Sequence, residues 1–234
     1  MTDLLRLHYA PDNASLIIRL ALEELHLPYE TILVDRKQNA HNSAAFRAIN
    51  PAGKIPALET PFGVMFETAA ILLWLADSHK ALAPPPDSPD RPHFLKWLFY
   101  VSNTLHANLR MTFYPSQYIP DAPEAAPALT AGARANVLQG LTLMEAVAGA
   151  GHDWCNGKTP SALDLYMAAL MRWMALYPND STDWFVISEW PNLLHMAARL
   201  QARASVTALC AAEGMSAHPF TQPKPPHPPE GSAI

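Results

Sequence analysis

Residues 50–58 read NPAGKIPAL. Pro51 and Gly53 are typical of a turn, and the apolar residues after them indicate a strand. Pro56 stands at the start of that strand, although it has no N–H to give to a neighbouring strand. We expect the Ile55–Pro56 bond to be cis, because an X–Pro bond prefers trans by only about 0.5–1 kcal/mol. The backbone N–H and C=O of Ile55 would then be available to an extended peptide.

Residues 66–71, FETAAI, end a short strand and begin a helix. Glu67 and Thr68 fall at the start of that helix, where unpaired N–H groups and a partial positive charge gather. Glu67 alone reads as an ordinary helix-start carboxylate. Together with the proline-marked strand, the pair predicts a site for a small zwitterionic peptide.

The two motifs, in this order and at this separation, resemble the glutathione-binding half of the cytosolic glutathione transferases, with bacterial beta-like and theta-like features. The resemblance implies an α/β thioredoxin-like first domain and an all-α second domain. It implies that the backbone of Ile55, beside Pro56, pairs with the cysteine of glutathione. It further implies that Glu67 and Thr68 hold the γ-glutamyl group.

The hydrophobic pattern predicts the same division of the chain. Strands and helices alternate in the first part, which favours a mixed four-stranded sheet whose first two strands are parallel. The expected strands are 4–9, 29–35, 55–59 and 64–66, and the expected helices are 15–26, 43–49 and 68–78. After a proline-rich linker, the apolar residues show helical spacing and no strand pattern. The expected helical segments run from 90 to 111, 129 to 147, 161 to 176, 191 onward and 205 to 213. Ser161 to Asp164 resembles a capping box.

We therefore divide the chain into residues 1–80, a linker at 81–92, a helical domain at 93–215 and a proline-rich tail at 216–234, which we expect to be extended or disordered. Half of the 234 residues are apolar, so a sizeable core is possible. The net charge of −5 offers no basic stripe for nucleic acid. No apolar run approaches the roughly 18 residues of a membrane span. Two distant cysteines and no signal-peptide pattern predict a cytoplasmic protein. The resemblance implies a homodimer with glutathione as co-substrate and no metal.

The expected chemistry requires the sulfur of glutathione as a thiolate, because the thiolate is the nucleophile. A hydroxyl or amide donor at a helix N-terminus stabilises that anion by hydrogen bond and dipole. Ser15, Tyr9 and Asn13 compete for this role around the turn after the first strand, and Ser15 is favoured. The alternative roles are a helix cap for Ser15, a half-buried strand aromatic for Tyr9 and a turn residue for Asn13. Ala14 stands where the beta class carries cysteine, so mixed-disulfide chemistry through that position is impossible.

A cation is expected beside the glycine carboxylate of glutathione. His41 and Lys54 match a theta-like pattern in which a histidine and a lysine hold this group. The alternative is that His41 is an exposed loop histidine and Lys54 a solvated turn lysine.

The second substrate is expected to be a hydrophobic electrophile between the domains, beside His106, Arg110, Phe113 and Tyr114. Phe113 and Tyr114 are alternatively core residues, and Arg110 a solvated one. A histidine at the His106 offset recurs in beta-class proteins. We predict a glutathione transferase. The alternatives are a glutathione-binding or protein-interaction module with little catalysis, or a glutathione-dependent lyase, dehalogenase, isomerase or peroxidase on the same fold.

Overall fold

The computed structural model describes residues 4–179 and 181–232. Its first part contains a four-stranded sheet with strand order β2-β1-β3-β4. The strands are β1 (Leu5–Tyr9), β2 (Tyr29–Leu33), β3 (Ala57–Thr60) and β4 (Gly63–Phe66). β1 pairs with β2 in parallel, and the β1–β3 and β3–β4 pairs are antiparallel. The mixed thioredoxin-like sheet is therefore confirmed.

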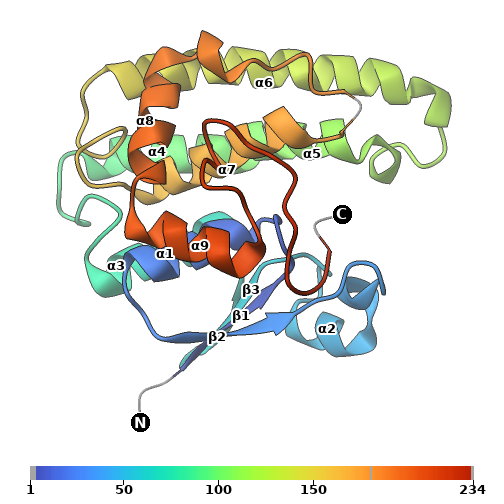
Figure 1. The fold of residues 1–234 in the computed structure, drawn as a ribbon, viewed down its shortest axis with the longest axis horizontal. Coiled ribbons are helices and arrows are strands. Elements are labelled where there is room, and N and C mark those ends of the chain that lie inside the picture. The colour runs from blue at the N-terminus through green and yellow to red at the C-terminus, as the bar shows by residue number, and fades with distance from the viewer. Residues whose placement is uncertain (1–3, 180, 233–234) are drawn as a thin grey trace.

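Three helices accompany this sheet: α1 (Ser15–Glu24), α2 (Ala44–Ile49) and α3 (Thr68–His79). α1 and α3 lie on the side of the sheet that faces the second part of the molecule, and α2 lies away from it (Figure 1). Eight consecutive residues of α1, from Ser15 to Leu22, are buried, because this helix is covered on both sides.

The second part is helical, as expected. Its α-helices are α4 (Arg91–Tyr100), α5 (Ala107–Phe113), α6 (Ala126–Gly149), α7 (Ala162–Leu176), α8 (Pro191–Gln201) and α9 (Ala204–Glu213). The predicted first helix of this part is α4 and α5 joined by a π-helical segment, η2 (Val101–His106), which the sequence pattern did not indicate. Short 3-10 turns occupy Ala40–Asn42, Pro115–Gln117, Pro123–Ala125 and Ile187–Glu189. Within the described ranges, no helix is long and apolar enough to cross a membrane.

The predicted capping box of α7 is present. The Ser161 hydroxyl accepts from the N–H of Asp164, and the Asp164 carboxylate accepts from the N–H of Ser161 at 2.8 Å. Asp164 also accepts from the N–H of Asn156, so the box fixes the preceding loop as well. α7 is buried over nearly its whole length and forms the centre of the helical part.

The proline-rich tail has no regular secondary structure in its described residues, but it is packed against the rest of the chain. Phe220 is fully buried, and the N–H of His227 donates to the carbonyl of Gly214 at 2.8 Å. Gly214 ends α9 in the left-handed conformation, with a φ of 65°. A Cβ at Gly214 would approach within 1.9 Å of the His227 carbonyl, so the close return of the tail requires glycine there.

Candidate functional site

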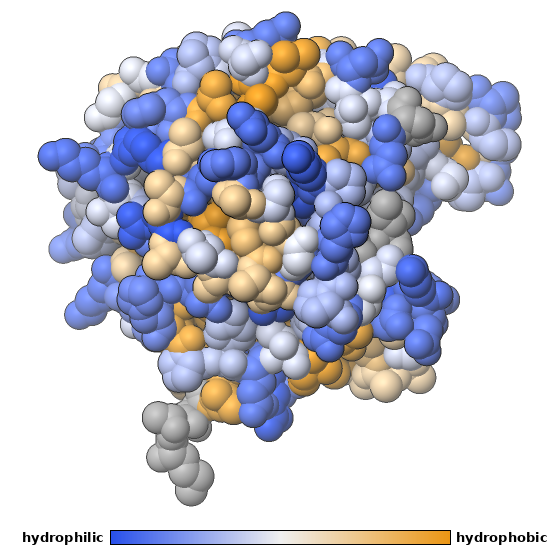
Figure 2. Space-filling view, in the orientation of Figure 1, coloured by the Kyte–Doolittle hydropathy of each residue, from blue (hydrophilic) through white to orange (hydrophobic). Residues whose placement is uncertain are grey.

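A cavity of about 680 Å³ lies between the sheet-containing part and the helical part. Figure 2 shows a notch in the right-hand outline of the molecule, between the upper helices and the lower region that contains α2. Ten of the residues singled out from the sequence line the cavity: Asn13, Lys54, Ile55, Pro56, Glu67, Thr68, His106, Arg110, Phe113 and Tyr114. Tyr9, Ser15 and His41 do not line it.

The turn before β3 brings backbone atoms to the cavity. The Ile55–Pro56 bond is cis, as predicted. The paired part of β3 begins at Ala57, so Ile55 lies outside the ladder. Asn50, which is 1% exposed, fixes this turn: its Nδ2 donates to the Lys54 carbonyl at 2.6 Å and its Oδ1 accepts from the Ala52 N–H at 3.0 Å. Asn50 itself lines the cavity and was not predicted from the sequence.

The start of α3 forms the neighbouring part of the wall. The helix begins at Thr68, and Glu67 precedes it with a φ of 73°. Such a backbone conformation is uncommon for a residue with a side chain and often occurs at functional sites. The N–H groups of the first helical turn have no partner within the helix, so this wall offers donors to an anionic group. The Glu67 carboxylate beside them offers an acceptor to a cationic one.

Neither of the two predicted catalytic hydroxyls reaches the cavity. Ser15 is fully buried, and its hydroxyl donates to the carbonyl of Ala10 at 3.0 Å and accepts from the N–H of Ala10 at 3.2 Å. The Tyr9 hydroxyl donates to the Glu230 carboxylate, and Tyr9 is 2% exposed. Burial first, and then Glu230, raises the pKa of Tyr9. The hydroxyls are held by the turn and by the tail, and this geometry does not favour either residue as the thiolate donor.

The turn between β1 and α1 presents Asp12, Asn13 and Ala14 to the cavity. Among residues 10–14, Asn13 alone carries a side-chain N–H. Its Oδ1 accepts from the N–H of Ala14 at 2.8 Å, which holds the side-chain amide at the start of α1. Asn13 therefore combines an amide donor with the positive end of a helix.

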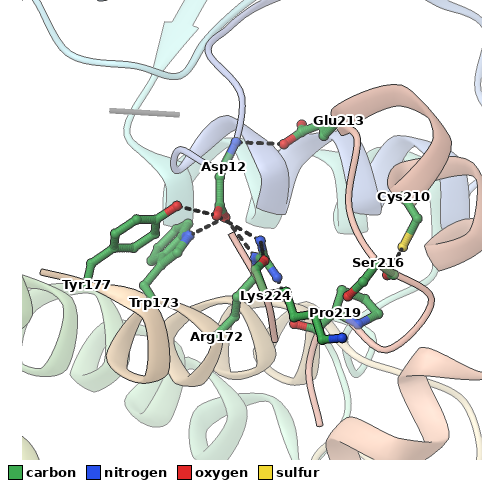
Figure 3. A network of polar contacts seen from close by, with 9 residues as sticks. All are labelled: Asp12, Arg172, Trp173, Tyr177, Cys210, Glu213, Ser216, Pro219 and Lys224. Carbon is green, nitrogen blue, oxygen red and sulfur yellow. Dashed lines mark hydrogen bonds and ion pairs between the residues drawn. The ribbon is translucent and has the colours of Figure 1, made fainter. Parts of the chain in front are cut away.

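Asp12 fixes this turn through contacts that sequence analysis did not reveal. Its carboxylate accepts from Arg172 Nε and Nη2, both at 2.9 Å, from Trp173 Nε1 at 2.9 Å and from the Tyr177 hydroxyl at 2.7 Å. Figure 3 shows these three side chains reaching Asp12 from α7 and its C-terminal end. The side chains of Asp12 and Arg172 are both 0% exposed. The N–H of Asp12 donates to Glu213 of α9 at 2.8 Å.

His41 and Lys54 differ in placement. Lys54 lines the cavity, and burial followed by the charge of Arg110 lowers its pKa. His41 lies in a 3-10 turn outside the lining, and its Nε2 is 3.2 Å from Nδ2 of Asn42. Burial and then the charges of Arg36 and Lys54 lower the pKa of His41. The role of His41 at the glycine carboxylate stays a prediction, and Lys54 lies on the cavity wall, where it can meet a carboxylate.

Aromatic side chains form the wall on the helical side. His106 Nδ1 lies 2.8 Å from the Tyr166 hydroxyl, and the two rings meet edge-on at 5.6 Å between centroids. His106 also meets Trp173 at 5.7 Å, and Phe113 meets Tyr177 at 6.3 Å. Burial, followed by the charge of Arg110, lowers the pKa of His106 to about 4, so this imidazole is neutral at physiological pH. Tyr114 and Tyr118 also line the cavity.

Comparison with known proteins agrees with this geometry. The family model described as "Glutathione S-transferase, N-terminal domain" matches residues 14–78. A glutathione transferase from Methylococcus capsulatus is 30% identical, with a TM-score of 0.72 over 90% of this chain and 99% of that one. The chain belongs to the glutathione transferase family. Glutathione S-transferase GstA from Escherichia coli O157:H7 is 28% identical over 90% of this chain and 100% of its own length.

A Sulfitobacter glutathione transferase homolog, solved with bound glutathione, has a TM-score of 0.77 and covers 89% of this chain and 97% of that one. At 23% identity this likeness concerns the fold. The family assignment fixes the arrangement of a thioredoxin-like part and a helical part around the cavity. The family assignment does not determine the reaction, which depends on the side chains of this family member.

No group of three or more histidine, cysteine, aspartate or glutamate residues placed to hold a metal ion occurs in the described part of the chain. The two cysteines, Cys155 and Cys210, are unpaired. Burial raises the pKa of the Cys155 thiol, and Cys210 is likewise shifted upward by burial. Neither cysteine lines the cavity.

Proposed function

We propose that this chain binds glutathione in the cavity, stabilises its thiolate and transfers it to a hydrophobic electrophile. The observation that carries the proposal is the convergence of the Ile55 backbone, the start of α3 and the start of α1 on one cavity. Glu67 holds the γ-glutamyl ammonium, and Thr68 with the first N–H groups of α3 holds the neighbouring carboxylate. Ile55 pairs with the backbone of the cysteine, and Lys54 holds the glycine carboxylate.

Asn13 is the proposed donor to the thiolate. A free thiol with a pKa of about 8.5 is only a few per cent ionised at neutral pH. Each unit by which the pKa falls requires about 1.4 kcal/mol of preferential interaction with the anion. An amide hydrogen bond and the N-terminus of α1 together supply an effect of that size. The sequence pattern also indicates Ser15 and Tyr9 as donors, but their hydroxyls are occupied by Ala10 and Glu230.

In the transfer step the thiolate forms a C–S bond with the electrophile, and the leaving group departs with the electron pair of the bond it breaks. The thiol proton is released before this step, when the thiolate forms. Because Ala14 carries no thiol, the protein supplies no sulfur of its own at this turn, and glutathione provides the only nucleophile there. The aromatic wall excludes water from the reacting centre and binds the apolar part of the electrophile.

The test is the pH titration of the thiolate absorbance of bound glutathione, in the wild type and in Asn13→Ala. We expect the wild-type midpoint below the solution value and the variant midpoint higher by about one unit. Ser15→Ala and Tyr9→Phe serve as matched donor controls and should move the midpoint much less. A thiol that keeps its solution pKa in the wild type would instead support a glutathione-binding module with little catalysis.

We further propose that the chain forms a homodimer through the β3–β4 hairpin. Phe62, at the hairpin tip, is 88% exposed, and Val64 and Phe66 on the edge strand β4 are 42% and 37% exposed. Light scattering should give the mass of two chains, and Phe62→Ser should shift the equilibrium toward one chain. A wild-type protein that has the mass of one chain at micromolar concentration would refute this assembly.

A further inference from the structure

The cationic side chains of the cavity are more numerous than glutathione requires. Arg36, Lys54 and Arg110 line it, whereas the lining carboxylates among the described residues are Asp12 and Glu67. Asp12 is already neutralised by Arg172 from the opposite side. In the proposed binding mode Glu67 meets the ammonium of glutathione and Lys54 its glycine carboxylate. The guanidinium groups of Arg36 and Arg110 also line the cavity.

Both guanidinium groups contact the aromatic wall. Arg36 Nη2 donates to the Tyr114 hydroxyl at 3.1 Å. The Arg110 guanidinium carbon lies 5.7 Å from the centroid of the same ring. Arg110 also reaches the Tyr118 hydroxyl at 3.3 Å and Gln117 Oε1 at 3.4 Å. Two positively charged side chains therefore contact Tyr114, at the position expected for the second substrate.

Arg110 is the better placed of the two. It lies one helical turn from His106 and one turn from Phe113 and Tyr114, so it shares their face of the η2–α5 helix. Within residues 4–179 and 181–232, no carboxylate forms an ion pair with it. Its hydrogen bonds to Tyr118 and Gln117 use Nε and Nη2 and are 3.3 and 3.4 Å long, whereas a guanidinium carries five N–H donors.

The charge of Arg110 extends across the cavity. It contributes to the lowered pKa of Lys54 on the glutathione side and to the lowered pKa of His106 on the inner side. Positive charge in a cavity with apolar walls attracts anions more strongly than it does at an open surface. Planar rings that stack against the aromatic wall would place a substituent at its rim, beside Arg110.

We propose that the second substrate is an aromatic electrophile that carries a carboxylate, and that Arg110 binds this carboxylate while the ring packs against the aromatic wall. The proposal rests on the transferase function proposed above and names the substrate class of the same site. Arg110 acts in recognition: it selects the anionic acceptor and takes no part in breaking the bond to the leaving group.

A matched pair of acceptors tests the proposal: 1-chloro-2,4-dinitrobenzene, which is neutral, and 4-chloro-3,5-dinitrobenzoate, which is anionic. Each forms a C–S bond with glutathione and releases chloride. Each enzymatic kcat/KM is divided by the uncatalysed rate constant with glutathione, which removes the difference in intrinsic reactivity. We expect the normalised value for the benzoate to exceed that for the neutral acceptor by about tenfold, the factor that one charge-assisted hydrogen bond worth 1.4 kcal/mol supplies.

Arg110→Gln should remove most of this preference, lowering kcat/KM for the benzoate about tenfold and for the neutral acceptor less than about threefold. Arg6→Gln is the matched control, because Arg6 lies on the exposed face of β1 and its ion pairs are solvent-exposed. Raising the salt concentration should weaken the benzoate reaction more than the neutral one.

Two results would overturn the proposal while leaving the transferase function intact. One is equal normalised values for the two acceptors in the wild type. The other is an Arg110→Gln effect that appears as a raised KM for glutathione with both acceptors, which would place Arg110 on the glycine carboxylate. If neither acceptor is consumed, the transferase function fails. Calorimetry with 3,5-dinitrobenzoate and 1,3-dinitrobenzene, in the presence of S-methylglutathione, then still decides whether the anionic ring is preferred and whether Arg110→Gln abolishes that preference.

Discussion

Replacing Asp12 with asparagine should destabilise this protein more than any change of one exposed carboxylate. Four donated hydrogen bonds meet on the Asp12 carboxylate, from Arg172, Trp173 and Tyr177. An asparagine retains one acceptor oxygen and turns an NH₂ group toward a guanidinium. Arg172, whose side chain is 0% exposed, would keep its charge without a counter-ion.

Breaking a buried ion pair by removing one partner costs about 3–5 kcal/mol. A typical folded protein has only about 5–15 kcal/mol of unfolding free energy, so the variant should lose a large fraction of its stability. Urea unfolding, monitored by tryptophan fluorescence and by circular dichroism, measures the difference. Asp87→Asn, on an exposed residue of the linker, is the matched control and should change the free energy of unfolding by less than about 0.5 kcal/mol.

A double-mutant cycle measures the interaction energy between Asp12 and Arg172 apart from their contacts with other residues. Arg172→Met alone should also destabilise, because Asp12 loses its counter-ion and the carbonyls of Pro219 and Lys224 lose a donor. The double variant Asp12→Asn with Arg172→Met should be less destabilised than the sum of the two single variants, since no unpaired charge remains. A loss below about 1 kcal/mol in Asp12→Asn, or strict additivity in the cycle, would refute the reasoning.

Two further predictions concern His106 and the tail. Burial and Arg110 lower the pKa of His106 from 6.5 to about 4, so the imidazole of the unfolded chain takes up a proton at a higher pH than that of the folded chain. The free energy of unfolding of the wild type should therefore fall by at most about 3 kcal/mol as the pH drops from 6.5 to 4. Urea titrations at pH 7 and pH 4.5 should show a smaller loss in His106→Gln, and an equal loss would contradict the assignment. Phe220→Ala should lower the free energy of unfolding by about 3 kcal/mol, because Phe220 is 0% exposed, whereas Phe99→Ala, at 45% exposure, should lower it by less than 1 kcal/mol. Similar losses in the two phenylalanine variants would show that the tail is not anchored by Phe220.

The features that the sequence predicted are local ones. The cis bond at Ile55–Pro56 was expected from the position of a proline within one short motif, and the capping box of α7 from two residues three positions apart. The alternation of strands and helices likewise predicted a mixed four-stranded sheet whose first two strands are parallel, because a helical crossover joins parallel strands.

The features that were missed depend on residues far apart in the chain. Asp12 and Arg172 are 160 residues apart, and Tyr9 and Glu230 are 221 residues apart. A pattern of a few residues carries no information about such pairs. For the same reason the sequence favours Ser15 over Asn13 as the thiolate donor. Ser15 and Tyr9 have suitable hydroxyls, but Ala10 of the turn and Glu230 of the tail occupy these hydroxyls in the structure.

The position of Asn13, the proposed thiolate donor, depends on the same distant contacts. Asn13 is joined directly to Asp12, and Asp12 is held on its carboxylate by α7 and on its N–H by α9. Arg172, which forms an ion pair with the Asp12 carboxylate, also donates to two carbonyls of the tail. The helical part and the tail therefore fix the turn that carries the proposed thiolate donor, although the proposed glutathione ligands lie in the sheet-containing part. A perturbation of the tail should accordingly raise the pKa of the thiol of bound glutathione before it weakens the binding of glutathione. The tail carbonyls accept from Arg172, whereas Asn50 holds the Ile55 turn and Tyr166 of α7 interacts with Thr68 at the start of α3.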